Sequence, residues 1–174
     1  MQNILLVIDM QNDFIDGALG TPEALAILPR VREKIAAFDG KVFYTRDTHE
    51  SEYLSTREGK HLPVPHCLRG TKGWEISSAL QGLRCDGIVD KPTFGSLDLL
   101  SLLREEDKKD PIVGITLIGV CTDICVISNA MLCKAAFTEA DVSVDASCCA
   151  GVTQESHKNA LSAMRACQIV IEND

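Results

Sequence analysis

The stretch that decides the fold of this chain is Leu117–Val126, which reads Leu-Ile-Gly-Val-Cys-Thr-Asp-Ile-Cys-Val. Residues typical of a buried strand end at Gly119, and an apolar pattern with helical spacing begins at Ile124. Thr122 and Asp123, between the two, are helix N-cap residues, because their side-chain oxygens accept hydrogen bonds from the unpaired amides of a first turn. The pattern therefore predicts a strand, a tight turn and a helix whose first turn carries a cysteine.

That cysteine is Cys125. The free N–H groups and the dipole at a helix N-terminus favour a thiolate over a thiol, which is the form that a nucleophilic cysteine needs. Cysteine is also one of the commonest buried core residues, so the position alone favours a packing role over a catalytic one. Other residues of the chain are needed to decide between a catalytic and a packing role for Cys125.

Length and composition are those of one ordinary soluble domain over residues 1–174. The formal net charge of -8 disfavours nucleic acid and anionic membranes as partners, and leaves small molecules as ligands. No apolar run approaches the roughly 20 residues that cross a bilayer, and strand residues follow Met1 too closely for a signal peptide. The eight cysteines therefore indicate reduced thiols, and we expect a cytoplasmic protein.

Two further strands end in residues that carry chemistry. The apolar strand Asn3–Ile8 is of the kind that is buried on both faces of a parallel sheet, and Asp9 follows it. The strand Gly87–Asp90 leads into Lys91, where a proline ends it. Carboxyl ends of parallel strands meet at one edge, so we expect Asp9 and Lys91 near Cys125. Taken singly, the aspartate also suits a turn cap and the lysine a solvated position.

Strands and helices alternate along the chain. The remaining strands are predicted at Val42–Thr45, Asp141–Val144 and Gln168–Ile171. Further helices are predicted at 21–38, with a break at Pro29, and at Trp74–Leu80, Ser96–Asp107 and Thr153–Cys167. Crossovers of this length join parallel strands with a right-handed connection. The predicted fold is a three-layer α/β/α structure with a mostly parallel six-stranded sheet, doubly wound in the Rossmann manner.

The long irregular stretch from Arg46 to Gly73 holds all but one of the histidines. Asp47 and His49, two residues apart, point to the same side of an extended segment, and His66 follows later in the loop. Carboxylate oxygens and imidazole nitrogens together suit Zn²⁺, Fe²⁺ or Mn²⁺. The loop therefore predicts a metal site, with solvated surface residues as the alternative.

With these residues in hand, the chain resembles the isochorismatase-like cysteine hydrolases, most closely their nicotinamidase branch. Gly119–Val126 is similar to the family's nucleophile segment, and Asp9–Phe14 and Lys91 match the other two catalytic positions. The resemblance implies a catalytic triad of Asp9, Lys91 and Cys125. It also implies an oxyanion hole made by two backbone amides, those of Cys121 and Cys125, and a cis peptide bond at Val120–Cys121.

The segments Asp47–His49 and Pro65–Thr71 resemble the metal motif of the nicotinamidase branch, which isochorismatases and carbamoyl-hydrolysing relatives generally lack. The resemblance implies one divalent metal ion, zinc before iron or manganese. Its expected ligands are Asp47, His49, Glu58 and His66. The fourth ligand varies in this branch, and we choose Glu58 over His61.

The same resemblance implies the reaction, hydrolysis of nicotinamide to nicotinate and ammonia through a cysteine thioester, a step of pyridine nucleotide salvage. The expected substrate-binding residues are Phe14, Leu19, Val120 and Cys121. Many nicotinamidases carry an aromatic residue shortly before the last metal histidine, and Leu62 and Pro63 stand there in this chain. Because relatives often assemble as dimers or tetramers, we expect a homo-oligomer.

Three other interpretations stay open. The first is a metal-free family hydrolase that acts on another small amide or a vinyl ether. The second is a non-enzymatic thiol redox sensor that uses Cys121 and Cys125, or Cys148 and Cys149. The third is a structural zinc protein built on thiolates, for which the chain offers no C-x-x-C pair.

Overall fold

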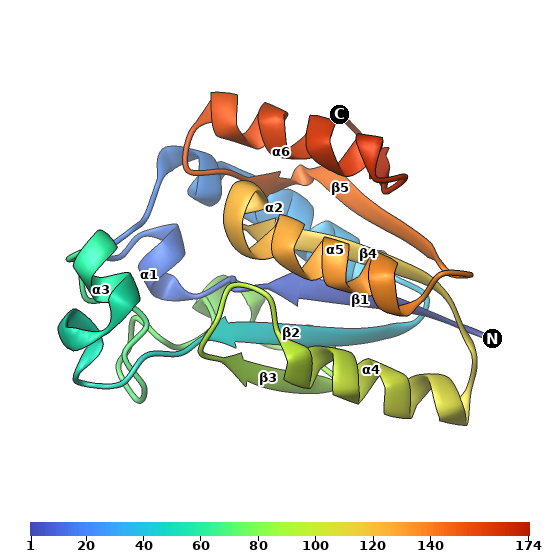
Figure 1. The fold of residues 1–174 in the computed structure, drawn as a ribbon, viewed down its shortest axis with the longest axis horizontal. Coiled ribbons are helices and arrows are strands. Elements are labelled where there is room, and N and C mark those ends of the chain that lie inside the picture. Colours follow the sequence, from blue (N-terminus) through green and yellow to red (C-terminus); the bar gives the residue numbers. More distant parts are fainter.

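The computed structural model describes residues 1–174 and has one six-stranded sheet at its centre (Figure 1). The strands are β1 (Gln2–Ile8), β2 (Lys41–Asp47), β3 (Gly87–Lys91), β4 (Ile112–Val120), β5 (Asp141–Ala150) and β6 (Val170–Glu172). They lie in the order β3-β2-β1-β4-β5-β6, and every neighbouring pair is parallel. The predicted three-layer, doubly wound α/β fold is confirmed.

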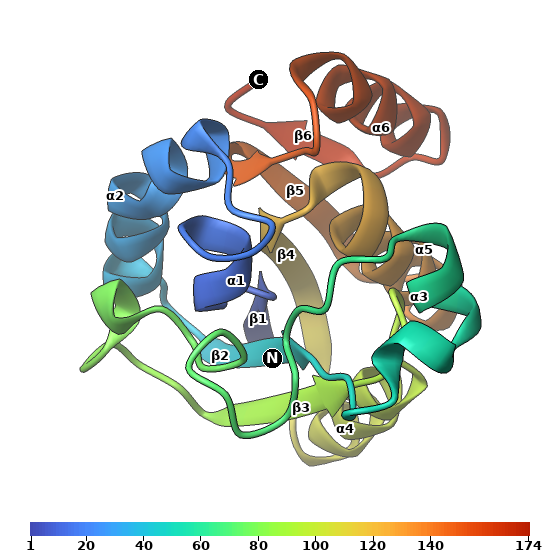
Figure 2. The same ribbon diagram turned by 90° about the vertical axis from the view of Figure 1, so that its left-hand side faces the viewer.

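Helices cover both faces of this sheet. The helix α2 (Pro22–Ala37) lies on one face, and the other is covered by α4 (Leu97–Lys109), α5 (Ile127–Ala136) and α6 (Gln154–Ala166) (Figures 1 and 2). Two short helices, α1 (Asn12–Ile15) and α3 (Arg57–His61), lie at the carboxyl edge of the sheet. No helix is long and apolar enough to cross a membrane.

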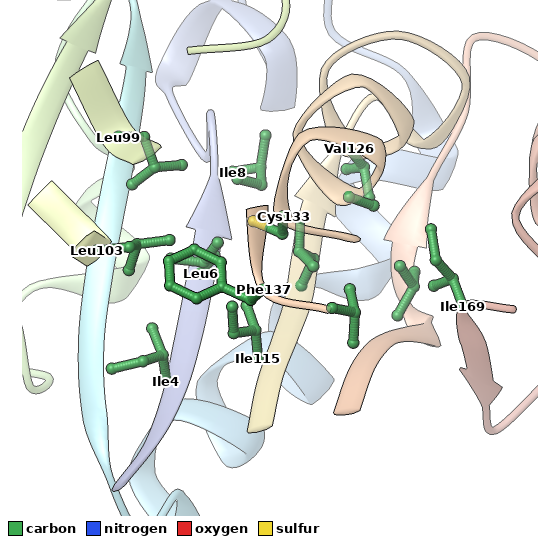
Figure 3. Close-up of a cluster of buried hydrophobic side chains, with 14 of the residues drawn as sticks. Ile4, Leu6, Ile8, Leu99, Leu103, Ile115, Val126, Cys133, Phe137 and Ile169 are labelled. Carbon is green, nitrogen blue, oxygen red and sulfur yellow. The ribbon is translucent and has the colours of Figure 1, made fainter. Parts of the chain in front are cut away.

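The central strand β1 contributes side chains to the hydrophobic cores on both faces of the sheet, because alternate side chains of a strand point to opposite faces. Ile4, Leu6 and Ile8 pack with residues of α4 and α5 (Figure 3), whereas Leu5 and Val7 pack with residues of α2. All five side chains are completely buried. This two-sided burial explains why β1 is a continuous apolar run with no polar alternation.

Two helix predictions were wrong. The first helical region is not divided at Pro29, because α2 runs through it without a break. The ring of Pro29 is exposed, so the carbonyl that it leaves unpaired can bind water, while the buried side chains on both sides of it hold the helix on the sheet. The predicted helix at Trp74–Leu80 is reduced to one 3-10 turn, Ser78–Leu80.

Strand β5 extends well beyond the predicted Val144 and ends at Ala150. Its last residues are small and polar or sulfur-bearing, which is weak strand composition, yet almost all are buried. Cys148 and Cys149 belong to this extension and pack in the cores on opposite faces of the sheet. The two thiols therefore do not form the pair that a redox sensor would need.

The order of the strands reverses direction between β1 and β4, which are neighbours at the centre of the sheet. Ligands of open α/β sheets bind outside the carboxyl ends of the strands at such a switch point. Asp9 follows β1, and the turn with Cys125 follows β4. Figure 2 looks onto this edge, where α1 and α3 lie.

Candidate active site

Three side chains, each at or just after the carboxyl end of a different strand, meet at the switch point. The Nζ atom of Lys91 lies 2.6 Å from Oδ2 of Asp9 and 3.3 Å from Sγ of Cys125. Asp9 and Lys91 are completely buried, and Cys125 is 5 % exposed. Together these groups supply a nucleophile, an acceptor for its proton and a positive charge that can stabilise the thiolate, which suits covalent catalysis by cysteine.

Asp9 is held in place by the neighbouring strand. Oγ1 of Thr45, on β2, donates to Oδ1 of Asp9 at 2.6 Å and accepts from the Asp9 amide at 3.2 Å. On the other side, a Cβ atom at Gly119 would stand 2.1 Å from the Ile8 carbonyl oxygen, so β4 approaches β1 this closely only with glycine there. These contacts fix the carboxylate between two strands.

The electrostatics of the thiol differ from the expected ones. Burial raises the pKa of Cys125 well above its usual range, and the nearby Asp9 carboxylate adds to this, while Lys91 opposes it. Burial likewise raises the pKa of Asp9 against the effect of Lys91. The thiol is therefore not ionised by its turn alone, and its proton has a basic acceptor within the same buried cluster.

The local structure around Cys125 explains the difference. A π-helical turn, Thr122–Val126, comes between β4 and α5, so Cys125 does not lie in the first turn of an α-helix. The predicted N-cap roles of Thr122 and Asp123 were wrong, since neither caps the turn. The Val120–Cys121 peptide bond is cis, as the family resemblance implied.

A second group of polar side chains lies beside the first. We call Asp47, His49, Glu58 and His66 the metal cluster; their four ligand atoms all lie within 4.8 Å of one another. Nε2 of His49 is 2.9 Å from Oδ2 of Asp47 and 3.6 Å from Oε1 of Glu58, and Nε2 of His66 is 3.4 Å from the same Asp47 oxygen. The structure brings Glu58 into this group and leaves His61 out of it.

The donor atoms of the metal cluster fit a divalent cation. Nδ1 of His66 lies 2.8 Å from the Val64 carbonyl oxygen, which can only accept, so this nitrogen carries the proton and Nε2 keeps a free lone pair. Nε2 of His49 is buried and makes no hydrogen bond, although Asp47 is close. Two carboxylates and two imidazoles that face one point match the ligand preference of Zn²⁺.

The loop that carries these ligands is tied to the chain after β1. His49 and Leu68 form a parallel bridge, which brings the two histidine segments together. The carboxylate of Asp13 accepts a hydrogen bond of 2.8 Å from the Cys67 amide, next to His66. A Cβ atom at Gly73 would stand 2.2 Å from this carboxylate, so any side chain there would displace Asp13 from its present position.

One pocket of about 410 Å³ joins the two groups. Its lining includes Cys125 and Cys121 on one side and Asp47, Glu58 and His66 on the other. The apolar part of its wall is Phe14, Leu19, Leu62, Phe94, Ile124 and Val152. The lining contains no lysine or arginine, so the pocket suits a neutral ligand better than an anion.

Most of the expected substrate-binding residues line this pocket, namely Phe14, Leu19 and Cys121. Val120 does not, because its side chain is buried in the core on the α2 face of the sheet. Of Leu62 and Pro63, the two residues expected in place of an aromatic one, Leu62 contributes an aliphatic part of the wall.

Two residues at the site, Tyr53 and Asn129, carried no signal in the sequence. The ring of Tyr53 packs against His49 and His66, with ring centres 4.6 and 5.0 Å apart. Asn129 donates to the carbonyl oxygen of Cys125 at 2.8 Å and to that of Phe94 at 3.0 Å. Both are ordinary residue types within ordinary elements, and only the folded contacts reveal them.

The whole chain is similar to a known family of proteins. A family model described as "Isochorismatase domain" matches residues 3–174. The nicotinamidase of Schizosaccharomyces pombe is 24% identical over 205 residues, which cover 96% of this chain and 91% of that protein.

Solved structures agree with the sequence comparison. The pyrazinamidase of Pyrococcus horikoshii, solved in complex with zinc, superimposes with a TM-score of 0.83 and 29% identity, covering 98% of both chains. A pyrazinamidase/nicotinamidase from Streptococcus mutans UA159 gives a TM-score of 0.82 and 28% identity, covering 97% of this chain and 99% of that one.

Proposed function

This chain belongs to the isochorismatase family and is a nicotinamidase-like hydrolase, and we propose that it hydrolyses nicotinamide to nicotinate and ammonia. The observation that carries this proposal is the single pocket shared by Cys125 and three members of the metal cluster. A carboxamide can reach the thiol in that pocket while its ring faces the cluster. The names of the relatives point to the same class of substrate.

In the proposed mechanism the Sγ atom of Cys125 attacks the carboxamide carbon while Asp9 accepts the thiol proton. The carbonyl oxygen takes the negative charge of the tetrahedral intermediate. Asp9 then returns the proton to the amine as the C–N bond breaks, which releases ammonia and leaves a thioester. Asp9 next deprotonates a water that attacks the thioester, and the proton finally returns to the departing Cys125 sulfur.

Two other parts of the site support these steps. Lys91, in contact with both Asp9 and Cys125, stays charged and stabilises whichever of them is negative. The backbone amides of Cys121 and Cys125 form the proposed oxyanion hole, a device worth about 3 kcal/mol per donor in other enzymes.

The metal cluster would hold one divalent ion, zinc before iron or manganese. When bound, such an ion supplies a Lewis-acid contact for the ring nitrogen of the substrate and so orients the ring. Phe14 packs edge-on against His66, with ring centres 5.6 Å apart, and closes the wall beside that contact. The substrate ring would thus be held between an aromatic wall and the aliphatic side chains opposite.

The main alternative is a metal-free relative that cleaves another small amide or a vinyl ether. The clustered ligand atoms favour the metal-dependent enzyme over this alternative. A carboxylated vinyl ether would also need a cation to bind its carboxylates, and the pocket offers acids in its place.

The test is ammonia release from nicotinamide by the purified protein, before and after chelation, with bound metal measured alongside. The proposal expects turnover that falls on chelation, returns with zinc and is absent from the Cys125→Ala variant. A protein that holds a stoichiometric metal and releases no ammonia would refute nicotinamide as the substrate. Turnover that survives complete loss of the metal would refute the metal-dependent mechanism.

A further inference from the structure

The turn that carries Cys125 is also hydrogen-bonded to α6. Oγ1 of Thr122 and Nδ1 of His157 share a hydrogen bond of 2.7 Å. Thr122 is completely buried and His157 is half-buried. Next to this contact, Oδ1 of Asp123 accepts a hydrogen bond of 3.0 Å from the Val152 amide.

We infer that His157 is a positioning residue, which sets the place of Cys125 through Thr122. The inference rests on the proposed function, because it assigns His157 a part in that reaction. His157 does not line the substrate pocket, so it cannot touch the substrate. Any effect on catalysis has to pass through the turn.

A displacement of Thr122 can reach Cys125 through the hydrogen bonds of the turn. The amides of Ile124 and Val126 both donate to the Cys121 carbonyl oxygen at 3.1 Å, which ties the start of the turn to its end. Thr122 lies inside this bonded loop. A shift at Thr122 therefore moves the Cys125 sulfur and the Cys121 amide together, and misplacement of reacting groups by about 1 Å can cost about 100-fold in rate.

The place of His157 is itself narrowly defined. A Cβ atom at Gly151 would stand 2.9 Å from Cβ of His157, so the ring reaches Thr122 only because residue 151 has no side chain. The other side of His157 borders a second pocket of about 320 Å³ between α2 and α6, which shares no lining residue with the substrate pocket. Thr122, in turn, has a buried hydroxyl that is costly to leave without a partner.

The experiment compares four single variants and the Thr122→Val/His157→Leu double variant with the wild type. His157→Leu removes the hydrogen-bonding nitrogen, and His157→Asn keeps a polar atom near the place of Nδ1. Thr122→Val removes the hydroxyl at nearly constant volume. Gln154→Ala changes an exposed neighbour on α6 that also borders the second pocket and is the matched control.

Four quantities are measured for each variant. They are kcat and KM for nicotinamide, the rate at which iodoacetamide alkylates Cys125 (located by tandem mass spectrometry) and the unfolding temperature. For His157→Leu and Thr122→Val we expect kcat and alkylation rate to fall about tenfold, with KM within about twofold. His157→Asn recovers most of the loss, and Gln154→Ala matches the wild type. The Thr122→Val/His157→Leu double variant is no slower than either single variant.

Wild-type kcat and alkylation rate in His157→Leu, well below its unfolding temperature, would overturn the inference. So would losses that multiply in the double variant, since the two residues would then act independently. If His157→Leu does not fold, His157→Asn and Thr122→Val decide the question. A wild-type protein without amide turnover would defeat the proposed function alone, because the alkylation rates would still show whether His157 positions Cys125.

Discussion

Gln11 pairs with the main chain of Asp47 through both ends of its side-chain amide. The Asp47 amide donates to Oε1 of Gln11 at 2.7 Å, and Nε2 of Gln11 donates to the Asp47 carbonyl oxygen at 2.8 Å. Gln11 is completely buried and also donates to the Trp74 carbonyl oxygen at 2.9 Å. The chain after β1 thus fixes the backbone of the first residue of the metal cluster.

Replacement of Gln11 by leucine is expected to weaken zinc binding about 10- to 100-fold, the usual cost of losing a partner that orients a ligand. Both Asp47 backbone groups would lose their partner and the carboxylate would be less well aimed. Competition with a chromogenic chelator measures the affinity. Gln81→Leu, at an exposed position outside the site, is the control, and equal affinities in the two variants would contradict the prediction.

Glu58 and His61 lie on the same short helix, and only Glu58 belongs to the metal cluster. We expect Glu58→Gln to reduce zinc affinity by about tenfold or more, since an amide oxygen is a weaker ligand than a carboxylate. His61→Gln should leave the affinity within about threefold of the wild type. Titration of both apoproteins with zinc makes the comparison, and a larger loss in His61→Gln would reverse the ligand assignment.

Asp9→Asn keeps the shape of the proposed base and removes its ability to accept a proton. We expect kcat for nicotinamide to fall by about 1,000-fold or more, in the range that loss of a general base produces. Intact-mass analysis after rapid quenching should show no acyl-enzyme, because the thiol of Cys125 can no longer give up its proton to this site. An Asp9→Asn enzyme that forms the thioester at the normal rate would assign the base elsewhere.

The contacts of Asp145 predict how the free energy of unfolding depends on pH. Its carboxylate is 2.9 Å from Nζ of Lys34 and accepts hydrogen bonds from Ser147 and Asn173. Burial opposes ionisation, yet these three partners lower the pKa of Asp145 below its ordinary value. Because the folded pKa is the lower one, the stabilisation is complete above the unfolded pKa of about 3.9 and is lost as the pH falls toward the folded value.

Asp145→Asn should therefore destabilise the protein by about 2 kcal/mol at pH 7, and the difference from the wild type should shrink below about pH 4. Urea unfolding at a series of pH values measures both. Asp141→Asn, at an exposed position on the same strand, is the control and should follow the wild type. A difference that grows as the pH falls would show that the carboxylate is not stabilised by these contacts.

Most of the fold could be predicted from the sequence, because the strands are strongly apolar and the helices are capped. The helices predicted to begin at Ser96 and Thr153 are present, and each of these side chains accepts a hydrogen bond from the first turn of its helix. The end of β5 could not be predicted, because its small residues have little strand propensity and are held there by burial between two cores. Propensity is a weak guide wherever tertiary packing decides.

The sequence predicted the site residues that lie at or follow strand ends, and it missed the turn that carries Cys125. Asp9, Lys91 and Cys125 were expected at one edge, and the structure brings them into contact. The π-helical turn was missed because Thr122 and Asp123 have the composition of N-caps, while their side chains bond to α6 and to the chain before it. Such long-range partners leave no periodic pattern in the sequence.

The short segment after β1 serves three parts of the molecule at once. Asp9 contacts Lys91, Gln11 holds Asp47, and Asp13 holds the amide of Cys67. An engineer who wished to graft a different loop for another metal or another ring would have to transplant this segment with it. We therefore expect the triad and the metal cluster to depend on the same segment, so that a graft which replaces the whole segment would disturb both at once.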